Sequence, residues 1–243
     1  MRTSNPMLRE DILRSSDRTG TDVATARGAT FKAFTLIVLT AATAAFSWVS
    51  SIQSGSYSGF ILFGGIGGLI VAMITAFKPT LAPITAPIYA ILEGLVLGAF
   101  SVYFETLYPG IASQAVLSTF TIFFLMLFLY QARIIKVTER FRSIVTTAII
   151  GIALVYLVSF VLSFFAPQFS IAARGGLFGL VFTGFVIVVA SFALMLDFDM
   201  IERAETFAMP KYMEWYCAFS ILVTLVWLYI EVLRFLSILR SQE

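Results

Sequence analysis

Seven apolar segments of membrane-spanning length dominate this sequence and limit the folds that are open to it. A helix needs about 20 consecutive apolar residues to cross a bilayer, and each of the seven segments meets or approaches that length. The connections between them are short, so no soluble domain interrupts the series. The segments lie at about residues 31–49, 60–77, 83–103, 112–130, 144–166, 175–196 and 213–239. We therefore predict an all-α integral membrane protein, with a seven-helix transmembrane domain in residues 31–243 after a flexible cytoplasmic tail in residues 1–30.

The composition supports this class and excludes several others. Hydrophobic residues make up 59% of the chain and charged residues only 12%, whereas soluble proteins average about 25% charged residues. A net charge of +2 is too small to indicate nucleic-acid binding, and the lipid bilayer is the expected partner. Histidine is absent, so imidazole is not available as a metal ligand or pH switch. Carboxylates are left as the groups that could titrate near neutrality when buried.

Basic residues alternate between the loops and indicate an orientation. Lys and Arg are frequent in the N-terminal tail and occur in the second, fourth and sixth loops, but the fifth loop carries only Arg174. The first and third loops have none. Because cytoplasmic loops are enriched in Lys and Arg, the N-terminus is predicted to be cytoplasmic. Seven full spans place the C-terminus on the far side. Arg234 and Arg240 argue against that side, and a re-entrant final segment is the alternative.

Three predicted spans carry a pair of glycines four residues apart. Such GxxxG pairs place two glycines on one helix face and allow a neighbouring backbone to approach closely, which predicts a tightly packed bundle. The pairs are Gly64 and Gly68, Gly94 and Gly98, and Gly175 and Gly179.

Acidic residues within the predicted spans are the first candidate functional groups. A charge at the centre of a membrane helix costs at least about 2.5 kcal/mol, so such an acid needs a partner, water or a proton. Glu93 lies near the middle of the third span, and Glu231 lies about two turns before the end of the seventh, one turn before Arg234. Each is either an ion-pathway carboxylate or a structural one, and Glu231 could pair with Arg234. The recurrence of Cys217, Thr224 and Glu231 at intervals of seven predicts that the final helix is the least lipid-exposed.

A second acidic group closes the sixth span. If the helix continues through it, Asp199, Glu202 and Arg203 share one face, while Asp197 points elsewhere. Acids at a helix C-terminus oppose the helix macrodipole, which is unusual for purely structural residues. We predict that Asp199 is a gate acid with Arg203 as its nearest partner, and a solvated helix end is the alternative. Asp199 and Glu93 are the candidate calcium ligands, because hard cations prefer oxygen ligands.

Segments in three spans resemble the Bax inhibitor family, also called the transmembrane Bax-inhibitor-motif family, and within it the bacterial YccA branch. They are EGLVLGAFS in the third span, LDFDMIERA at the end of the sixth and YIEVLRFLSIL in the seventh. The resemblance extends from about Phe31 onward. It implies six helices packed around a central seventh. It also implies a pH-sensitive calcium leak that is governed by two aspartates, one on each of the last two helices.

The resemblance assigns the sixth-helix aspartate to Asp199. Its seventh-helix partner falls at or near Thr224, which is not an acid, and Glu231 or Glu93 could take that role. The resemblance further implies a protein of the bacterial plasma membrane that is not an enzyme, has no cofactor and passes calcium or protons. The alternatives are a non-catalytic regulator that binds other membrane proteins, such as a membrane protease, and a secondary transporter.

Overall fold

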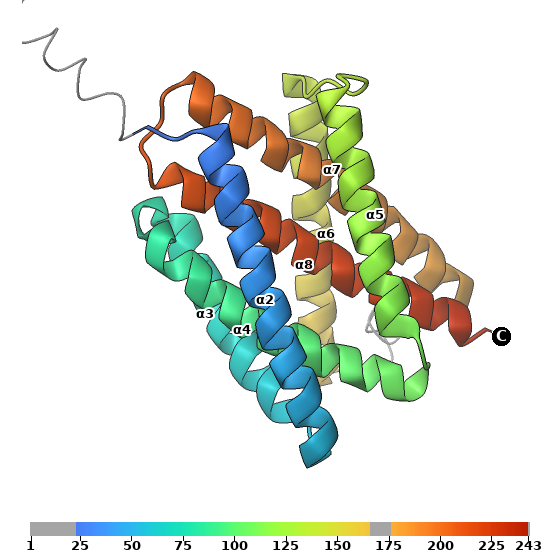
Figure 1. The fold of residues 1–243 in the computed structure, drawn as a ribbon. Coiled ribbons are helices and arrows are strands. Elements are labelled where there is room, and N and C mark those ends of the chain that lie inside the picture. The colour runs from blue at the N-terminus through green and yellow to red at the C-terminus, as the bar shows by residue number, and fades with distance from the viewer. Residues whose placement is uncertain (1–22, 166–175, 243) are drawn as a thin grey trace, which may run out of the picture.

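The computed structural model describes residues 23–165 and 176–242 as a bundle of long α-helices. Each of the seven helices in these ranges is long and apolar enough to cross a membrane, which confirms the predicted all-α fold. Figure 1 shows their arrangement. The helices are α2 (Ala26–Ser54), α3 (Ser58–Phe77), α4 (Ala82–Leu107), α5 (Ile111–Gln131), α6 (Glu139–Phe165), α7 (Gly176–Thr206) and α8 (Met213–Arg240), and the 3-10 turn η3 (Pro79–Leu81) precedes α4.

The first helix begins before the predicted span. α2 starts at Ala26 and not at Phe31, with the extended residue Thr25 as its N-cap. Val23 forms an isolated antiparallel bridge with a residue of the α7–α8 loop. The helix therefore begins within the predicted tail, because Thr25 supplies a capping side chain upstream of the apolar run. The rest of the predicted tail, residues 1–22, lies outside the described residues.

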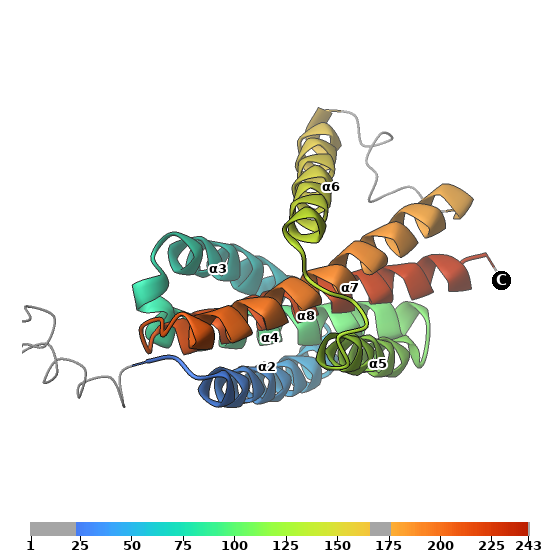
Figure 2. The same ribbon diagram turned by 90° about the horizontal axis from the view of Figure 1, so that it is seen from above.

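The seventh helix in the chain, α8, is the most buried. Half of the residues in its most apolar stretch are buried, against 17% in α3 and α6. α8 packs against α2, α4, α5 and α7, whereas α3 packs mainly on α4 and α6 mainly on α7. Figure 2 shows α6 standing apart from the other helices. The predicted arrangement of six helices packed around a central seventh therefore holds only in part: four helices surround α8, and α3 and α6 pack outside them.

α8 is one continuous helix that crosses the bundle. It begins after the α7–α8 loop, and its last residue, Arg240, donates a hydrogen bond of 3.3 Å to Gln114 at the start of α5. Because consecutive helices run in opposite directions, the start of α5 and the start of α8 lie at opposite ends of the bundle (Figure 1). The final segment is therefore one continuous helix that is long and apolar enough for a full span, and the choice between a full span and a re-entrant segment stays a prediction.

Two of the predicted glycine pairs lie where helices meet. A Cβ atom at Gly68 would lie 2.8 Å from Oε1 of Glu93 on α4, and one at Gly64 would lie 2.7 Å from a backbone oxygen of the same helix. A Cβ atom at Gly94 or Gly98 would overlap residues of α2. These glycines therefore allow α3 to approach α4, and α4 to approach α2. In the third pair, Gly179 is buried and Gly175 lies outside the described ranges.

Gly98→Val is expected to disrupt the contact between α4 and α2. The new Cβ atom would overlap the backbone of Ala44 and the side chain of Ser47, and a backbone cannot rotate away as a long side chain can. Overpacking costs about 1–3 kcal/mol, and a backbone overlap lies at the upper end of that range. Thermal unfolding in detergent, followed by circular dichroism, should show a clearly lower melting temperature. The control is Gly151→Val, since nothing lies within 4 Å of that position. Equal melting temperatures would show that Gly98 makes no tight contact.

Candidate functional site

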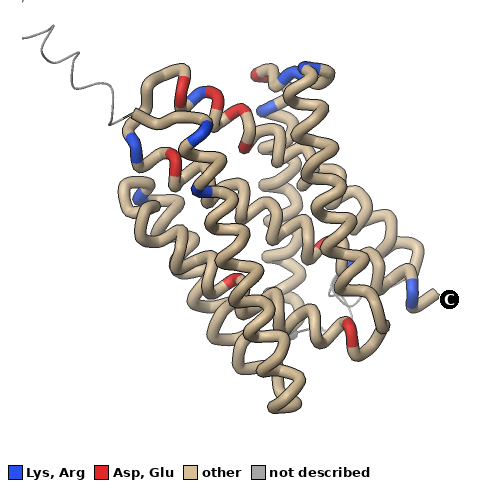
Figure 3. Tube along the Cα trace, in the orientation of Figure 1, with Lys and Arg blue, Asp and Glu red and all other residues tan. Residues whose placement is uncertain are grey.

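Charged side chains gather at one end of the bundle. We call this the charged end. It carries the start of α2, the α3–α4 turn, and the α5–α6 and α7–α8 loops. Figure 3 shows most Lys, Arg, Asp and Glu residues there, with few along the helices. The end of α7 lies among them, because this helix continues past its apolar part to Thr206.

Asp199 lies between two arginines from different helices. Its Oδ2 atom forms ion pairs with Arg142 of α6 and with Nε of Arg203, the second at 2.8 Å. Arg203 also pairs with Glu139 of α6 at 2.9 Å. The Asp199 side chain is only 15% exposed, so these ion pairs are partly shielded from water. Arg203 is the partner that the sequence predicted. Arg142 was missed, because it lies 57 residues away in the chain and no local spacing connects the two.

Glu202 forms the outer part of the same network. The Tyr130 hydroxyl of α5 donates to its Oε2 atom, and Arg133 lies 3.4 Å from Oε1. Glu202 and Arg133 are both exposed, and exposed ion pairs contribute at most about 1 kcal/mol. A polar pocket of about 690 Å³ opens here between α5, the α5–α6 loop and α7, and Asp199 and Arg203 also line it. The predicted common face of Asp199, Glu202 and Arg203 is therefore the wall of a pocket.

Asp197 points away from this network and into the contact between α7 and α8. It is 6% exposed, its Oδ1 atom accepts a hydrogen bond from Ser220 of α8, and Thr224 is also near it. Its Oδ2 atom has no hydrogen-bond partner among the described residues. The position near Thr224 therefore faces Asp197, whereas the resemblance assigned it to Asp199. The two aspartates diverge because two residues along an α-helix rotate a side chain by about 200°.

Glu231 is the second buried carboxylate on α8. It is 3% exposed, and its Oε1 atom accepts a hydrogen bond of 2.5 Å from the Tyr156 hydroxyl of α6. The Arg234 guanidinium lies 5.8 Å from the centre of the Tyr156 ring, and one of its nitrogens lies 3.4 Å from the Tyr156 oxygen. The Glu231–Arg234 pair considered from the sequence thus becomes a three-residue cluster around Tyr156, which connects α6 to α8.

Glu231 and the α8 residues near Asp197 lie along one face of α8. Ser220, Thr224 and Glu231 are separated by four and seven residues, spacings that recur on the same side of a helix. At 1.5 Å per residue, Ser220 and Glu231 are about 16 Å apart along the axis. Asp197 reaches this face from α7, and Tyr156 reaches it from α6.

Glu93 lies apart from both carboxylates. It is half-buried on α4, faces Gly68 of α3 and interacts with Tyr89 one turn earlier. Glu93 and Asp199, the two candidate calcium ligands, therefore do not form one site. Within residues 23–165 and 176–242, no group of three or more Asp, Glu, Cys or His side chains could hold a metal ion. The proposed role of Glu93 in ion passage stays a prediction.

Glu214, at the start of α8, is the charged site that the sequence analysis missed. Its side chain is 1% exposed and forms ion pairs with Lys32 of α2 and, at 2.8 Å, with Lys211. It also accepts hydrogen bonds of 2.9 Å from the backbone nitrogen and the hydroxyl of Thr25. A Cβ atom at Gly28 would overlap the Glu214 carboxylate, so this glycine makes room for it. An acid in the first turn of a helix is common, and no sequence signal marked this one.

Nearly the whole chain matches one protein family. The family model is described as Bax inhibitor 1 like, and the match covers residues 5–241. Neither a curated protein nor a solved structure gives a significant match. The match leaves out only residues 1–4 and 242–243, and so covers the Asp199 network, the Asp197 contact and the Glu231 cluster. On this evidence the chain belongs to the Bax inhibitor 1-like family.

Proposed function

We propose that this protein is a proton-gated cation leak channel, with calcium as its principal ion. The observation that carries the proposal is Asp197, a buried carboxylate that forms no ion pair among the described residues and has one oxygen without a partner there. An acid at membrane depth is costly, and one without a basic partner is poorly explained by stability. A role in the passage of cations or protons would explain why Asp197 is a carboxylate. The lack of a clustered metal site in the described part of the chain fits a leak, in which the ion must not bind tightly.

The proposed gate is the attachment of α6 to the helices beside it. α6 is attached to α7 through the Arg142–Asp199 and Arg203–Glu139 ion pairs and to α8 through the Tyr156–Glu231 hydrogen bond. Between these two points its buried apolar contact with α7 is small and centres on Ile152. Loss of the Asp199 charge would leave the Arg203–Glu139 pair, the more exposed of the two, and α6 could then move away from α7. The channel would accordingly open as the pH at the charged end falls.

The proposal includes an orientation. The basic loops lie at the charged end, and cytoplasmic loops are enriched in Lys and Arg. The charged end and the N-terminus would then face the cytoplasm of a bacterial plasma membrane, so that cytoplasmic acidification opens the channel. The C-terminus would lie on the other side.

A secondary transporter is the second candidate, because the helices pack as two similar groups. α2 and α3 both pack on α4, while α5 and α6 both pack on α7, and α4 and α7 each pack on α8. The two groups of three helices have opposite orientations, as in transporters built from inverted repeats. The regulator of a membrane protease, as in the YccA branch, has no comparable support from the described contacts.

Calcium entry into liposomes that contain the purified protein tests the proposal. With a calcium-sensitive dye inside the vesicles and calcium outside, we expect entry down the gradient that rises as the pH is lowered. Protein-free liposomes are the control. A transporter would need a second ion gradient to move calcium. No entry at any pH, with or without such a gradient, would contradict both candidates and favour a regulator.

A further inference from the structure

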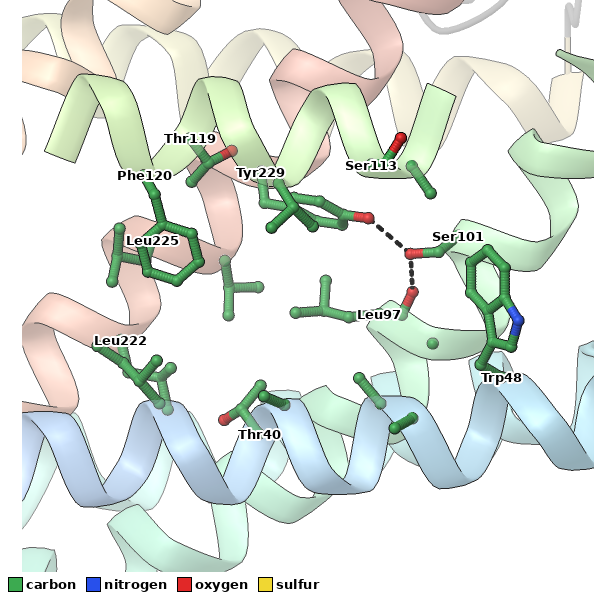
Figure 4. A pocket seen from close by; sticks show the side chains of 18 of the residues that line it. Thr40, Trp48, Leu97, Ser101, Ser113, Thr119, Phe120, Leu222, Leu225 and Tyr229 are labelled. Atoms are coloured by element: carbon green, nitrogen blue, oxygen red, sulfur yellow. Dashed lines mark hydrogen bonds between the residues drawn. The ribbon is translucent and has the colours of Figure 1, made fainter. Parts of the chain in front are cut away.

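Two pockets of the bundle differ in their chemistry. One is a groove between α2 and α5, where the hydroxyls of Ser101 and Tyr229 bond to each other at 2.7 Å (Figure 4). No described residue that lines this groove is charged. The other is the polar pocket at the charged end, which is lined by five charged side chains: Arg133, Lys136, Asp199, Glu202 and Arg203. A charged ligand would therefore be recognised at the polar pocket.

The charges that line the polar pocket favour an anion. Three are positive and two are negative, so positive charge is in excess. Both carboxylates already have a cationic partner. Asp199 pairs with Arg203 at 2.8 Å. Glu202 pairs with Arg133 at 3.4 Å. Lys136 forms no ion pair within the described part of the chain. A cation that entered the pocket would find no free carboxylate, whereas an anion would find a free ammonium group.

Arg133 has a backbone conformation that favours glycine. Its φ angle is 53°, and it lies two residues after the last residue of α5. Its backbone nitrogen donates to the carbonyl of Tyr130 at 3.0 Å, and that of Ile134 donates to the carbonyl of Leu129 at 3.1 Å. These two bonds form the helix ending in which glycine is the usual left-handed residue. An arginine there costs stability, and its exposed ion pair recovers little. A strained residue in the wall of a pocket indicates a functional constraint.

The α5–α6 loop adds backbone donors to these side chains. Ile135, Lys136 and Val137 line the pocket, and no described residue accepts a hydrogen bond from their backbone nitrogens. The helix α6 begins directly after them. Its first turn is capped by the Thr138 hydroxyl, which accepts a hydrogen bond of 3.2 Å from the backbone nitrogen of Phe141. The start of a helix carries partial positive charge. Cationic side chains and free backbone N–H groups beside a helix N-terminus are the combination that binds phosphate.

We propose that the polar pocket binds a phosphate group, which is held by Arg133, Lys136 and the backbone nitrogens of the α5–α6 loop. Arg203 lines the same pocket but is already paired with Asp199 and, at 2.9 Å, with Glu139, so it adds charge and no direct contact. The binding is measured without ion flow and does not rest on the proposed channel.

A soluble phosphate compound and a phospholipid headgroup both carry this group, and two measurements on the full-length protein distinguish them. Titration with inorganic phosphate in detergent, at constant ionic strength and followed by ³¹P NMR, detects a soluble ligand. Native mass spectrometry after detergent exchange counts retained phosphatidylglycerol. Saturable binding of inorganic phosphate identifies a soluble ligand, and retention of phosphatidylglycerol without such binding identifies a headgroup. The proposal fails if the wild type shows neither.

Lys136→Gln and Lys78→Gln form a matched pair for both measurements. The two lysines are exposed at the charged end and each change removes one positive charge, but only Lys136 lines the pocket. We expect Lys136→Gln to bind phosphate about tenfold more weakly than the wild type, because a charged hydrogen bond is lost. Lys78→Gln should bind like the wild type. Equal loss in the two variants would overturn the proposal, since the binding would then come from the general charge of this end.

Arg133→Gly separates binding from folding. The change removes the guanidinium, and glycine adopts a positive φ without steric cost. We expect phosphate binding about tenfold weaker than in the wild type, with a melting temperature equal to or above that of the wild type. Unchanged binding would overturn the assignment of Arg133. Weaker binding together with a lower melting temperature would also overturn it, because Arg133 would then be a structural residue of the loop.

Discussion

Asp199→Asn is expected to raise calcium entry into liposomes at neutral pH and to remove most of its dependence on pH. At neutral pH the charged Asp199 carboxylate pairs with Arg142 and Arg203, and we expect these pairs to favour the closed state. The proposed gate opens when this charge is lost. The amide keeps the shape of the side chain without the charge, so the variant should resemble the protonated wild type at every pH. A change of about 1.4 kcal/mol would shift the open-to-closed ratio about tenfold.

Asp197→Asn is the comparison that makes this result specific. Asp197 lies two residues earlier in α7 but faces Ser220, away from both arginines. Loss of its charge should therefore lower calcium entry at all pH values, because the pathway loses a carboxylate, and leave the shape of the pH profile unchanged. If both variants flatten the profile equally, or neither alters calcium entry, the end of α7 is not a gate.

The helix faces that carry the acids could be predicted from the sequence, but their partners on other helices could not. Helical spacing was sufficient to place Asp199 beside Arg203 and to separate both from Asp197, because these relations depend only on the 3.6-residue period. Arg142 lies on another helix, and its contact with Asp199 depends on how α6 packs against α7. In the same way, the glycine pairs predicted close contacts between helices but did not indicate which helices would meet.

Burial explains the other differences between prediction and structure. Glu231 was predicted to lie on the least lipid-exposed helix, because Cys217, Thr224 and Glu231 recur at intervals of seven, yet its partner is a tyrosine of α6 that no sequence pattern marked. Tyrosine occurs in membrane helices both at interfaces and in packing contacts. The presence of a tyrosine therefore does not by itself indicate a hydrogen bond. Glu214 looked like an ordinary acid of a first helical turn. It becomes buried only because Thr25, Gly28 and Lys32 of the N-terminal region pack over it.

Glu214→Ala is expected to lower the free energy of unfolding by about 3 kcal/mol. Removing one partner of a buried ion pair costs about 3–5 kcal/mol, and the lower end applies because Lys211 can turn to water. Lys32 would keep its charge in a largely buried position, and Thr25 would lose the acceptor for two hydrogen bonds. Thermal or denaturant unfolding in detergent measures the change. The control is Glu205→Ala, an exposed carboxylate of the same region that accepts one backbone hydrogen bond, and it should cost less than about 1 kcal/mol.

The double variant Lys32→Met/Glu214→Leu separates charge from packing at this site. If Glu214→Ala is unstable because Lys32 is left with a buried and uncompensated charge, then replacing both partners by apolar residues should recover most of the stability. If the loss comes mainly from the hydrogen bonds to Thr25, the double variant should be as unstable as the single one, since leucine cannot accept them. Stability of Glu214→Ala equal to that of the wild type would contradict the proposed role altogether. The start of α8 would then be held in place by its apolar contacts alone.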